Sequence, residues 1–88
     1  MGYSPIPPDL VVEVIGNPAN SAEMSELLVK VPNYIAEGIV VWVIDPVAEQ
    51  VKVYEPQKAV KILTADMTLI GGVIFPDFAV RVGDLFAE

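Results

Sequence analysis

The chain has 88 residues, of which 53% are hydrophobic, so we expect one small domain. Cysteine and histidine are both absent, which excludes disulfide bonds, thiolate or imidazole metal ligands, and catalysis by either side chain. Twelve acidic residues against five basic ones leave a net charge of −7, which argues against tight non-specific DNA binding by the chain alone.

The high apolar content predicts self-association. A chain this short buries a smaller share of its surface than a larger domain does, so part of its apolar surface is expected to contact another subunit or a missing part of a larger fold. Prolines, glycines and acidic residues interrupt every apolar run before it reaches the ~20 residues of a membrane span. The N-terminus shows no signal-peptide pattern. We therefore expect a homo-oligomeric, cytoplasmic protein without a membrane contact.

The first third of the chain predicts an extended arm, a strand and a helix. Residues 1–8 hold three prolines and are expected to form an extended arm ahead of a single domain over residues 9–88. Residues 10–15 are rich in Val and Ile, which favours a strand. Asn20 or Ser21 can cap the helix that follows, in which apolar residues recur every three to four positions, and Glu23 lies three residues after Asn20, as a capping box requires.

This helix contains one internal conflict, Pro32. A proline inside a helix removes a backbone hydrogen bond and clashes with the preceding turn. We expect Pro32 to kink the helix, or to split it so that a second piece begins near this residue. Gly38 is suited to end the helix, because glycine tolerates the left-handed backbone of a C-terminal cap.

The middle of the chain predicts three strands. Residues 39–44 form a continuous apolar run, which is typical of a strand that is buried on both faces. Residues 51–54 alternate apolar and polar side chains, so this strand should have one wet face. Residues 60–63 are expected to return beside it as the second strand of a hairpin.

The last third predicts shorter elements. Residues 68–74 resemble an edge segment that is interrupted by two glycines, and residues 79–82 resemble a short strand. Residues 83–86 are expected to form a terminal helical turn, with Leu85 and Phe86 docked on the core.

Together these elements predict a small α/β fold with a mixed sheet. The first strand, the helix and the second strand form a βαβ unit, which should be parallel and right-handed. The hairpin then extends the sheet in the antiparallel sense.

The strand at residues 10–15 carries a carboxylate, Glu13, within an apolar run. Residues two apart in a strand share a face, so Asp9, Val11, Glu13 and Ile15 point the same way. Asp9 and Glu13 lie ~13 Å apart along a strand, too far for both to ligate one Mg²⁺ at ~2 Å. A metal site at Glu13 therefore needs a second carboxylate from elsewhere.

Lys30 is the basic side chain that could approach Glu13, because it lies on the helix that packs against the sheet. There it could neutralise charge on a phosphate or orient a water. The alternatives are that Glu13 is an exposed strand residue or a structural ion-pair partner of Lys30, and that Lys30 is an ordinary surface lysine. Periodicity alone leaves these alternatives open.

The order and spacing of several short motifs closely resemble one known family. The motifs are Pro8-Asp9-Leu-Val-Val-Glu13, Lys30-Val-Pro-Asn-Tyr34, Val41-Trp42-Val-Ile-Asp45-Pro46, Val51-Lys-Val-Tyr54 and Gly71-Gly72-Val-Ile-Phe-Pro76. This succession resembles the Uma-two family of restriction endonuclease-like proteins, which belongs to the PD-(D/E)XK nuclease superfamily. The resemblance extends from about residue 8 to residue 86 and implies a restriction-endonuclease-like core.

The resemblance implies a metal-dependent nuclease site. Glu13 matches the second carboxylate of the family and would be the metal ligand, whereas Lys30 matches the catalytic lysine. Such sites are expected to bind Mg²⁺ and to hydrolyse phosphodiesters with an activated water. The family's first catalytic Asp lies on an upstream strand that has no counterpart here, so the chain resembles the C-terminal half of a member.

Two functional hypotheses follow. The first is a truncated endonuclease-like protein that is inactive alone and has DNA as a weak partner, unless a second chain supplies the missing carboxylate. The alternative is a non-catalytic structural or interaction module that oligomerises through an exposed sheet surface.

Overall fold

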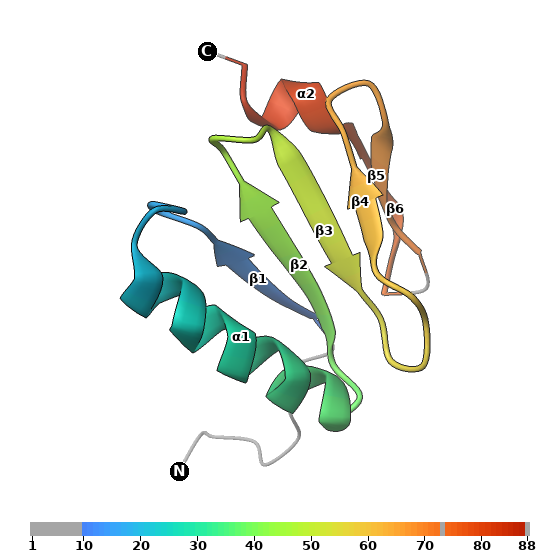
Figure 1. Cartoon of the computed structure of the whole chain (residues 1–88). Coiled ribbons are helices and arrows are strands. Elements are labelled where there is room, and N and C mark those ends of the chain that lie inside the picture. The colour runs from blue at the N-terminus through green and yellow to red at the C-terminus, as the bar shows by residue number, and fades with distance from the viewer. Residues whose placement is uncertain (1–9, 73, 88) are drawn as a thin grey trace, which may run out of the picture.

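The computed structural model describes residues 10–72 and 74–87 of the chain, in which six strands and two helices are present (Figure 1). In chain order these elements are β1 (Leu10–Val14), α1 (Ser21–Ala36), β2 (Val40–Asp45), β3 (Gln50–Tyr54), β4 (Lys61–Leu63), β5 (Thr68–Gly71), β6 (Phe75–Arg81) and α2 (Val82–Leu85). The predicted mixed α/β fold is confirmed. The predicted arm at residues 1–8 and the residue Asp9 lie outside the described part of the chain.

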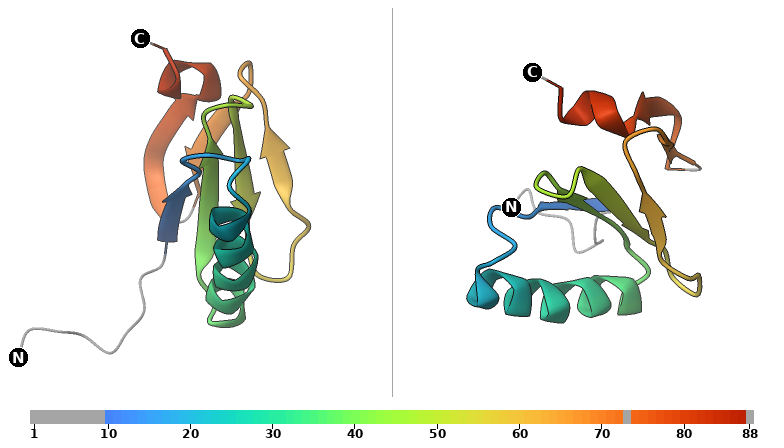
Figure 2. Two further views of the ribbon diagram at one scale, coloured as in Figure 1. Left: turned by 60° about the vertical axis from the view of Figure 1, so that its left-hand side comes forward. Right: turned by 45° about the horizontal axis from the view of Figure 1, so that its top comes forward.

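The four N-terminal strands form one sheet in the order β1-β2-β3-β4. β1 pairs with β2 in parallel, whereas β3 and β4 join in the antiparallel sense. The βαβ unit and the hairpin are therefore both confirmed. Figure 2 shows α1 on one side of this sheet and the β5–β6 hairpin with α2 on the other, so that the sheet is the middle of three layers.

Each face of the sheet carries its own hydrophobic cluster, because side chains alternate between the faces along each strand. The cluster beneath α1 is built on Ile15, Val31, Val41 and Val43. The cluster beneath the β5–β6 hairpin is built on Trp42, Val51, Val53, Leu69 and Val82. β2 supplies residues to both clusters, which confirms that this strand is buried on both faces.

The start of α1 is capped as predicted, but its first glutamate reaches further back than a capping box requires. The Asn20 side-chain oxygen accepts a hydrogen bond from the Glu23 N–H at 3.1 Å. The Glu23 carboxylate in turn accepts hydrogen bonds from the backbone N–H groups of Gly16 and Asn17, at 2.9 and 2.7 Å. This carboxylate therefore fastens the β1–α1 loop to the helix.

α1 continues through Pro32, so the prediction that the helix splits there was wrong. Pro32 and Leu28 are both exposed. The Leu28 carbonyl, which loses its helical partner at a proline, can thus bond to water. The helix ends at a Schellman motif: Gly38 has φ +81°, its N–H donates to the Ile35 carbonyl, and the Ile39 N–H donates to the Tyr34 carbonyl.

One face of β3 is less exposed to solvent than predicted. Tyr54 packs against the cluster beneath α1, and Lys52 is half-buried. The polar positions of this strand point toward α1, so the helix covers much of the face that the alternation alone assigned to water.

The C-terminal region differs most from expectation. β5 and β6 form a separate two-stranded antiparallel sheet, and β6 begins at Phe75, earlier than the short strand predicted at residues 79–82. The glycine pair explains the turn, since Gly72 has φ +61° and a Cβ on Gly71 would overlap the Phe75 carbonyl. Val82 at the start of α2 is fully buried. Phe86, which follows α2, packs on the core as predicted, but Leu85 is 40% exposed.

Candidate functional site

Glu13 and Lys30 line the same cleft, which opens between β1 and α1. The cleft has a volume of ≈ 100 Å³. Ile15, two residues after Glu13, packs in the cluster beneath α1, so the alternation of β1 directs Glu13 to the helix side of the sheet. The described structure thus brings the two predicted site residues together, although their chemical roles stay predictions.

Within the described part of the chain, neither Glu13 nor Lys30 takes part in an ion pair. Among residues 10–72 and 74–87, the ion pairs join Lys58 and Lys61 to Glu55, at 3.6 and 3.5 Å, and none involves Glu13 or Lys30. Glu13 is half-buried and Lys30 is exposed. The interpretation that these two residues form a structural ion pair is therefore not supported in the described part of the chain.

Two further glutamates line this cleft, Glu23 and Glu26. Glu23 is held by its bonds to the backbone N–H groups of Asn17 and Gly16, and these hydrogen bonds lower the pKa of its carboxyl below the usual value. Glu26 was missed by sequence reasoning. Its spacing offered a signal, because residues four apart on a helix share a face and Glu26 lies four residues before Lys30.

The residues of the cleft do not by themselves fit a complete metal centre. No group of three or more acidic side chains that could hold an ion is present within the described ranges. Mg²⁺ demands near-octahedral oxygen coordination and is usually held by one or two carboxylates together with substrate phosphates and water. Glu13, Glu23 and Glu26 supply the carboxylates that line the cleft, and the Glu23 carboxylate already accepts two backbone hydrogen bonds.

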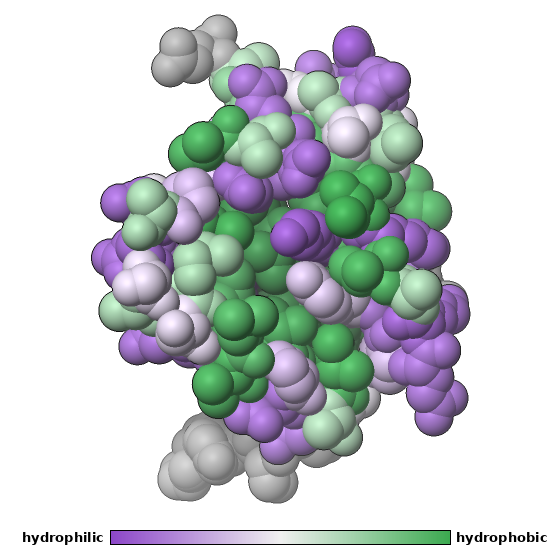
Figure 3. Space-filling view, viewed as in Figure 1, coloured by the Kyte–Doolittle hydropathy of each residue, from purple (hydrophilic) through white to green (hydrophobic). Residues whose placement is uncertain are grey.

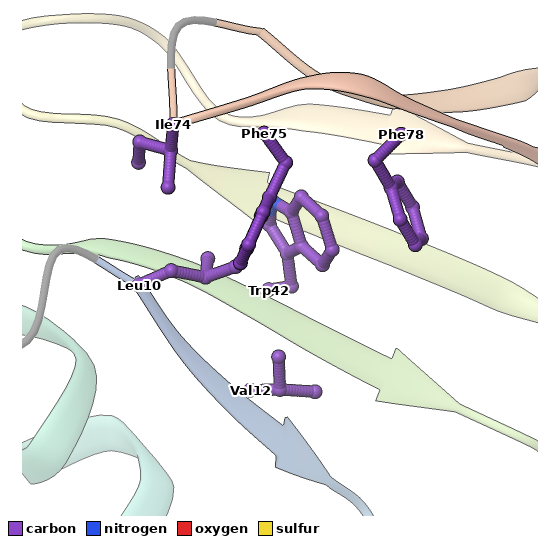
Figure 4. A pocket seen from close by; sticks show the side chains of 6 residues that line it. All are labelled: Leu10, Val12, Trp42, Ile74, Phe75 and Phe78. Carbon is purple, nitrogen blue, oxygen red and sulfur yellow. The ribbon is translucent and has the colours of Figure 1, made fainter.

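A second hollow lies on the opposite face of the sheet, between β1–β2 and the β5–β6 hairpin. It is an open groove of ≈ 560 Å³, and the side chains that line it are all apolar, as Figure 4 shows: Leu10, Val12, Trp42, Ile74, Phe75 and Phe78. The Trp42 and Phe78 rings lie 5.5 Å apart at an angle of 39°. The expected burial of residues 39–44, which include Trp42, did not predict this groove.

A third hollow lies between α1 and β3. Apolar side chains gather along the middle of the face that Figure 3 shows, and a cleft of ≈ 170 Å³ there is lined by residues such as Leu27, Val31 and Tyr54. These residues belong to the helix–sheet packing.

No helix in the described ranges is long and apolar enough to cross a membrane.

Comparisons with known proteins give the family and the fold of the chain. The family described as "Uma2: Putative restriction endonuclease" matches residues 2–83. A crystal structure of "a putative nuclease belonging to DUF820" from Anabaena variabilis ATCC 29413 matches with a TM-score of 0.78 and 24% identity. No curated protein matches the chain.

The match to the solved nuclease covers 92% of this chain but 45% of that one, so the chain spans less than half the length of that relative. At this identity the likeness concerns the fold. The match to the family extends over nearly the whole chain and confirms the resemblance seen in its motifs. The chain therefore belongs to the Uma2 family of restriction endonuclease-like proteins.

Proposed function

We propose that this chain is a nuclease-fold module that contributes Glu13 and Lys30 to a centre for phosphodiester hydrolysis, and that it does not cleave DNA by itself. The observation that carries this proposal is the shared cleft between β1 and α1, which is lined by a carboxylate and an ammonium group that form no ion pair within the described part of the chain. Family membership supports the reaction class.

In this proposal the two side chains have different roles. The Glu13 carboxylate would be a ligand to a divalent cation such as Mg²⁺, which supplies charge neutralisation and an activated water when bound. The Lys30 ammonium would stabilise negative charge on the phosphate or orient the attacking water. Glu26, on the same wall as Lys30, would tune the charge of the cleft.

Two features are the reason why the chain is expected not to cleave DNA without a partner. Among the described residues, no group of three or more acidic side chains is close enough together to hold a metal ion. The chain carries a net charge of −7, and Lys58 and Lys61 are already paired with Glu55, so its attraction for DNA is weak. Cleavage would require a partner that brings both a further ligand and basic surface.

Metal titration followed by NMR tests the site without requiring activity. Addition of Mn²⁺ is expected to broaden the amide signals around Glu13 and Lys30 first, because paramagnetic broadening falls steeply with distance. Glu13→Gln should remove this local broadening. The matched control is Glu49→Gln, which removes an exposed carboxylate in the turn between β2 and β3. Broadening that is equal in wild type and Glu13→Gln would overturn the assignment of Glu13.

A plasmid-cleavage assay with Mg²⁺ or Mn²⁺ tests the second half of the proposal. The chain alone is expected to leave the DNA intact. Cleavage by the wild type that is lost in both Glu13→Gln and Lys30→Ala would show that the chain is active without a partner and would support the two site residues.

A second candidate function is a non-catalytic interaction module. The apolar groove beside Trp42 favours it, because exposed apolar surface of this kind marks contact sites on soluble domains. A cytoplasmic location stays a prediction for either function.

A further inference from the structure

Glu23 joins the first turn of α1 to the end of β1 by two hydrogen bonds. Its carboxylate oxygens accept from the Gly16 and Asn17 N–H groups at 2.9 and 2.7 Å, and both residues lie in the short loop between the strand and the helix (Figure 1). Bonds from a backbone N–H to a carboxylate are shorter and stronger than those between neutral groups. They are also directional, so they fix where the start of the helix lies relative to the strand.

Gly16 is suited to this contact. A Cβ at this position would lie 3.1 Å from Glu23 Oε2, which is closer than ordinary van der Waals contact. The carboxylate therefore lies directly against the backbone of the loop, in space that a larger side chain would take. The ladder of the sheet reaches to this point, because the Ile15 N–H still donates to the Ile44 carbonyl at 2.9 Å. Glu23 thus binds the backbone donors of the first two residues that follow the ladder.

Apolar packing alone does not fix how α1 is turned about its axis. Val31 is the buried residue of this helix, and it packs with Val41 and Val43 of β2 in the cluster beneath α1. Contact between apolar side chains is non-directional, so it holds the helix against the sheet more firmly than it fixes the rotation. Side-chain direction changes by about 100° per helix residue, so a modest rotation would turn a side chain at the edge of this contact out of the cleft. The two bonds of Glu23 supply the direction that the packing lacks.

The helix face that Glu23 anchors is also the face that carries Lys30. Glu23, Glu26 and Lys30 follow one another at spacings of three and four residues, which places them on one side of the helix. All three line the cleft that also contains Glu13. Glu23 and Lys30 are about 10 Å apart along the helix axis, at a rise of 1.5 Å per residue. A helix that is held at Glu23 therefore presents Lys30 to the cleft two turns later.

We propose that Glu23 is a positioning residue of this cleft: by binding the Gly16 and Asn17 N–H groups, it holds α1 at the rotation that turns Lys30 toward Glu13. This inference rests on the proposed function, in which the side chains of Glu13 and Lys30 act on one phosphodiester. Glu23 acts on the helix in this role and not on the metal or the substrate, because both of its oxygens already accept backbone hydrogen bonds.

Residual dipolar couplings measured by NMR report the orientation of α1 relative to β2 and β3 without any metal. Glu23→Ala removes both acceptors, so the couplings of α1 should no longer fit the wild-type orientation, whereas those of the two strands should. Glu23→Gln keeps one acceptor oxygen and should show a smaller change of the same kind, which provides the test if Glu23→Ala does not fold. The matched control is Asn20→Ala. It removes the hydrogen bond to the Glu23 N–H at the same end of the helix and should leave the orientation of α1 unchanged.

Mn²⁺ broadening then tests the consequence for the cleft. With Mn²⁺ at Glu13, the broadening of the Lys30 signals relative to the Glu13 signals reports the distance between the two residues. In Glu23→Ala the broadening at Lys30 should be lost, while that at Glu13 persists. Glu26→Gln is the control for charge, because it removes one carboxylate from the same cleft and leaves the Glu23 hydrogen bonds in place. Its ratio of Lys30 to Glu13 broadening should equal that of the wild type.

Two sets of outcomes are distinguishable. An unchanged orientation of α1 in the Glu23 variants, or an equal change in Asn20→Ala, would overturn the inference. A Glu26→Gln variant that loses the Lys30 broadening to the same extent as Glu23→Ala would overturn it as well, since the effect would then be one of charge. Failure of the proposed function gives a different result. Mn²⁺ would then cause no local broadening in the wild type, while the orientation of α1 would still change in the Glu23 variants and not in Asn20→Ala.

Discussion

The Glu23 carboxylate accepts a hydrogen bond from the Asn17 N–H at 2.7 Å, the shortest of the side-chain hydrogen bonds in the described part of the chain. Its second oxygen accepts from the Gly16 N–H. One helix residue thus satisfies two backbone donors of the loop that leaves β1. Since Glu23 also lines the cleft of Glu13 and Lys30, this clamp sets how β1 and α1 face each other.

Glu23→Gln is expected to lower the thermal midpoint at neutral pH, because a neutral amide accepts backbone hydrogen bonds more weakly than a carboxylate does. The hydrogen bonds from the Asn17 and Gly16 N–H groups hold the folded-state pKa of the Glu23 carboxyl below its ordinary value of about 4.5. The carboxylate therefore stabilises the fold above pH 4.5, and this contribution is lost as the pH falls through the lowered pKa. The difference between wild type and Glu23→Gln should accordingly narrow below pH 4.5 in thermal melts.

Glu26→Gln is the control for that measurement. It removes a carboxylate from the same helix, one turn further along, for which no backbone hydrogen bond is present in the described ranges. Its melting curve should follow wild type at every pH. A pH-independent gap between wild type and Glu23→Gln would contradict the charge-based explanation.

Leu69→Ala tests whether the hairpin layer is part of the cooperative fold. Leu69 is 2% exposed in the cluster beneath β5–β6, so truncation should cost about 2–5 kcal/mol in free energy of unfolding. Leu28→Ala removes the same atoms from a side chain that is 75% exposed and should change stability by less than ~0.5 kcal/mol. Urea denaturation measures both, and equal effects would show that the hairpin does not pack as described.

The central part of the fold could be predicted because periodicity and burial agree there. The apolar run at β2 and the alternation in β3 identify strands whose pairing follows from short connections. The β5–β6 sheet could not be predicted in this way. β6 contains Pro76 and mixes aromatic, acidic and aliphatic residues without alternation, so its strand character depends on pairing with β5.

In the candidate site, too, some features could be predicted from the sequence and others could not. The family resemblance singled out Glu13 and Lys30, whereas strand alternation left their roles open, and the structure shows that both residues line one cleft. The apolar groove was missed because Leu10 and Phe78 are distant in sequence and meet only after the hairpin folds back over the sheet. No local pattern carries information about such a long-range contact.

Gly71→Ala should disrupt the turn that closes this hairpin. A Cβ on Gly71 would overlap the backbone carbonyl of Phe75, which cannot move without breaking the β5–β6 pairing. Gly38→Ala is the comparison, since Gly38 has φ +81° but open space around it, and the strained backbone alone should cost about 1–2 kcal/mol. The loss of stability in denaturation should be larger for Gly71→Ala. A larger loss for Gly38→Ala would contradict this close contact.

Glu13→Gln and Lys30→Ala should each leave the free energy of unfolding within about 0.5 kcal/mol of wild type. Glu13 is only half-buried, Lys30 is exposed, and neither forms an ion pair in the described part of the chain. Urea denaturation of both variants checks this, with Val41→Ala as the destabilised reference, because Val41 is fully buried. Substitution of a residue that supports the fold would lower the free energy of unfolding. Substitution of a residue that only binds a ligand would leave the free energy of unfolding unchanged. A marked loss in either variant would therefore favour a structural role over a catalytic one.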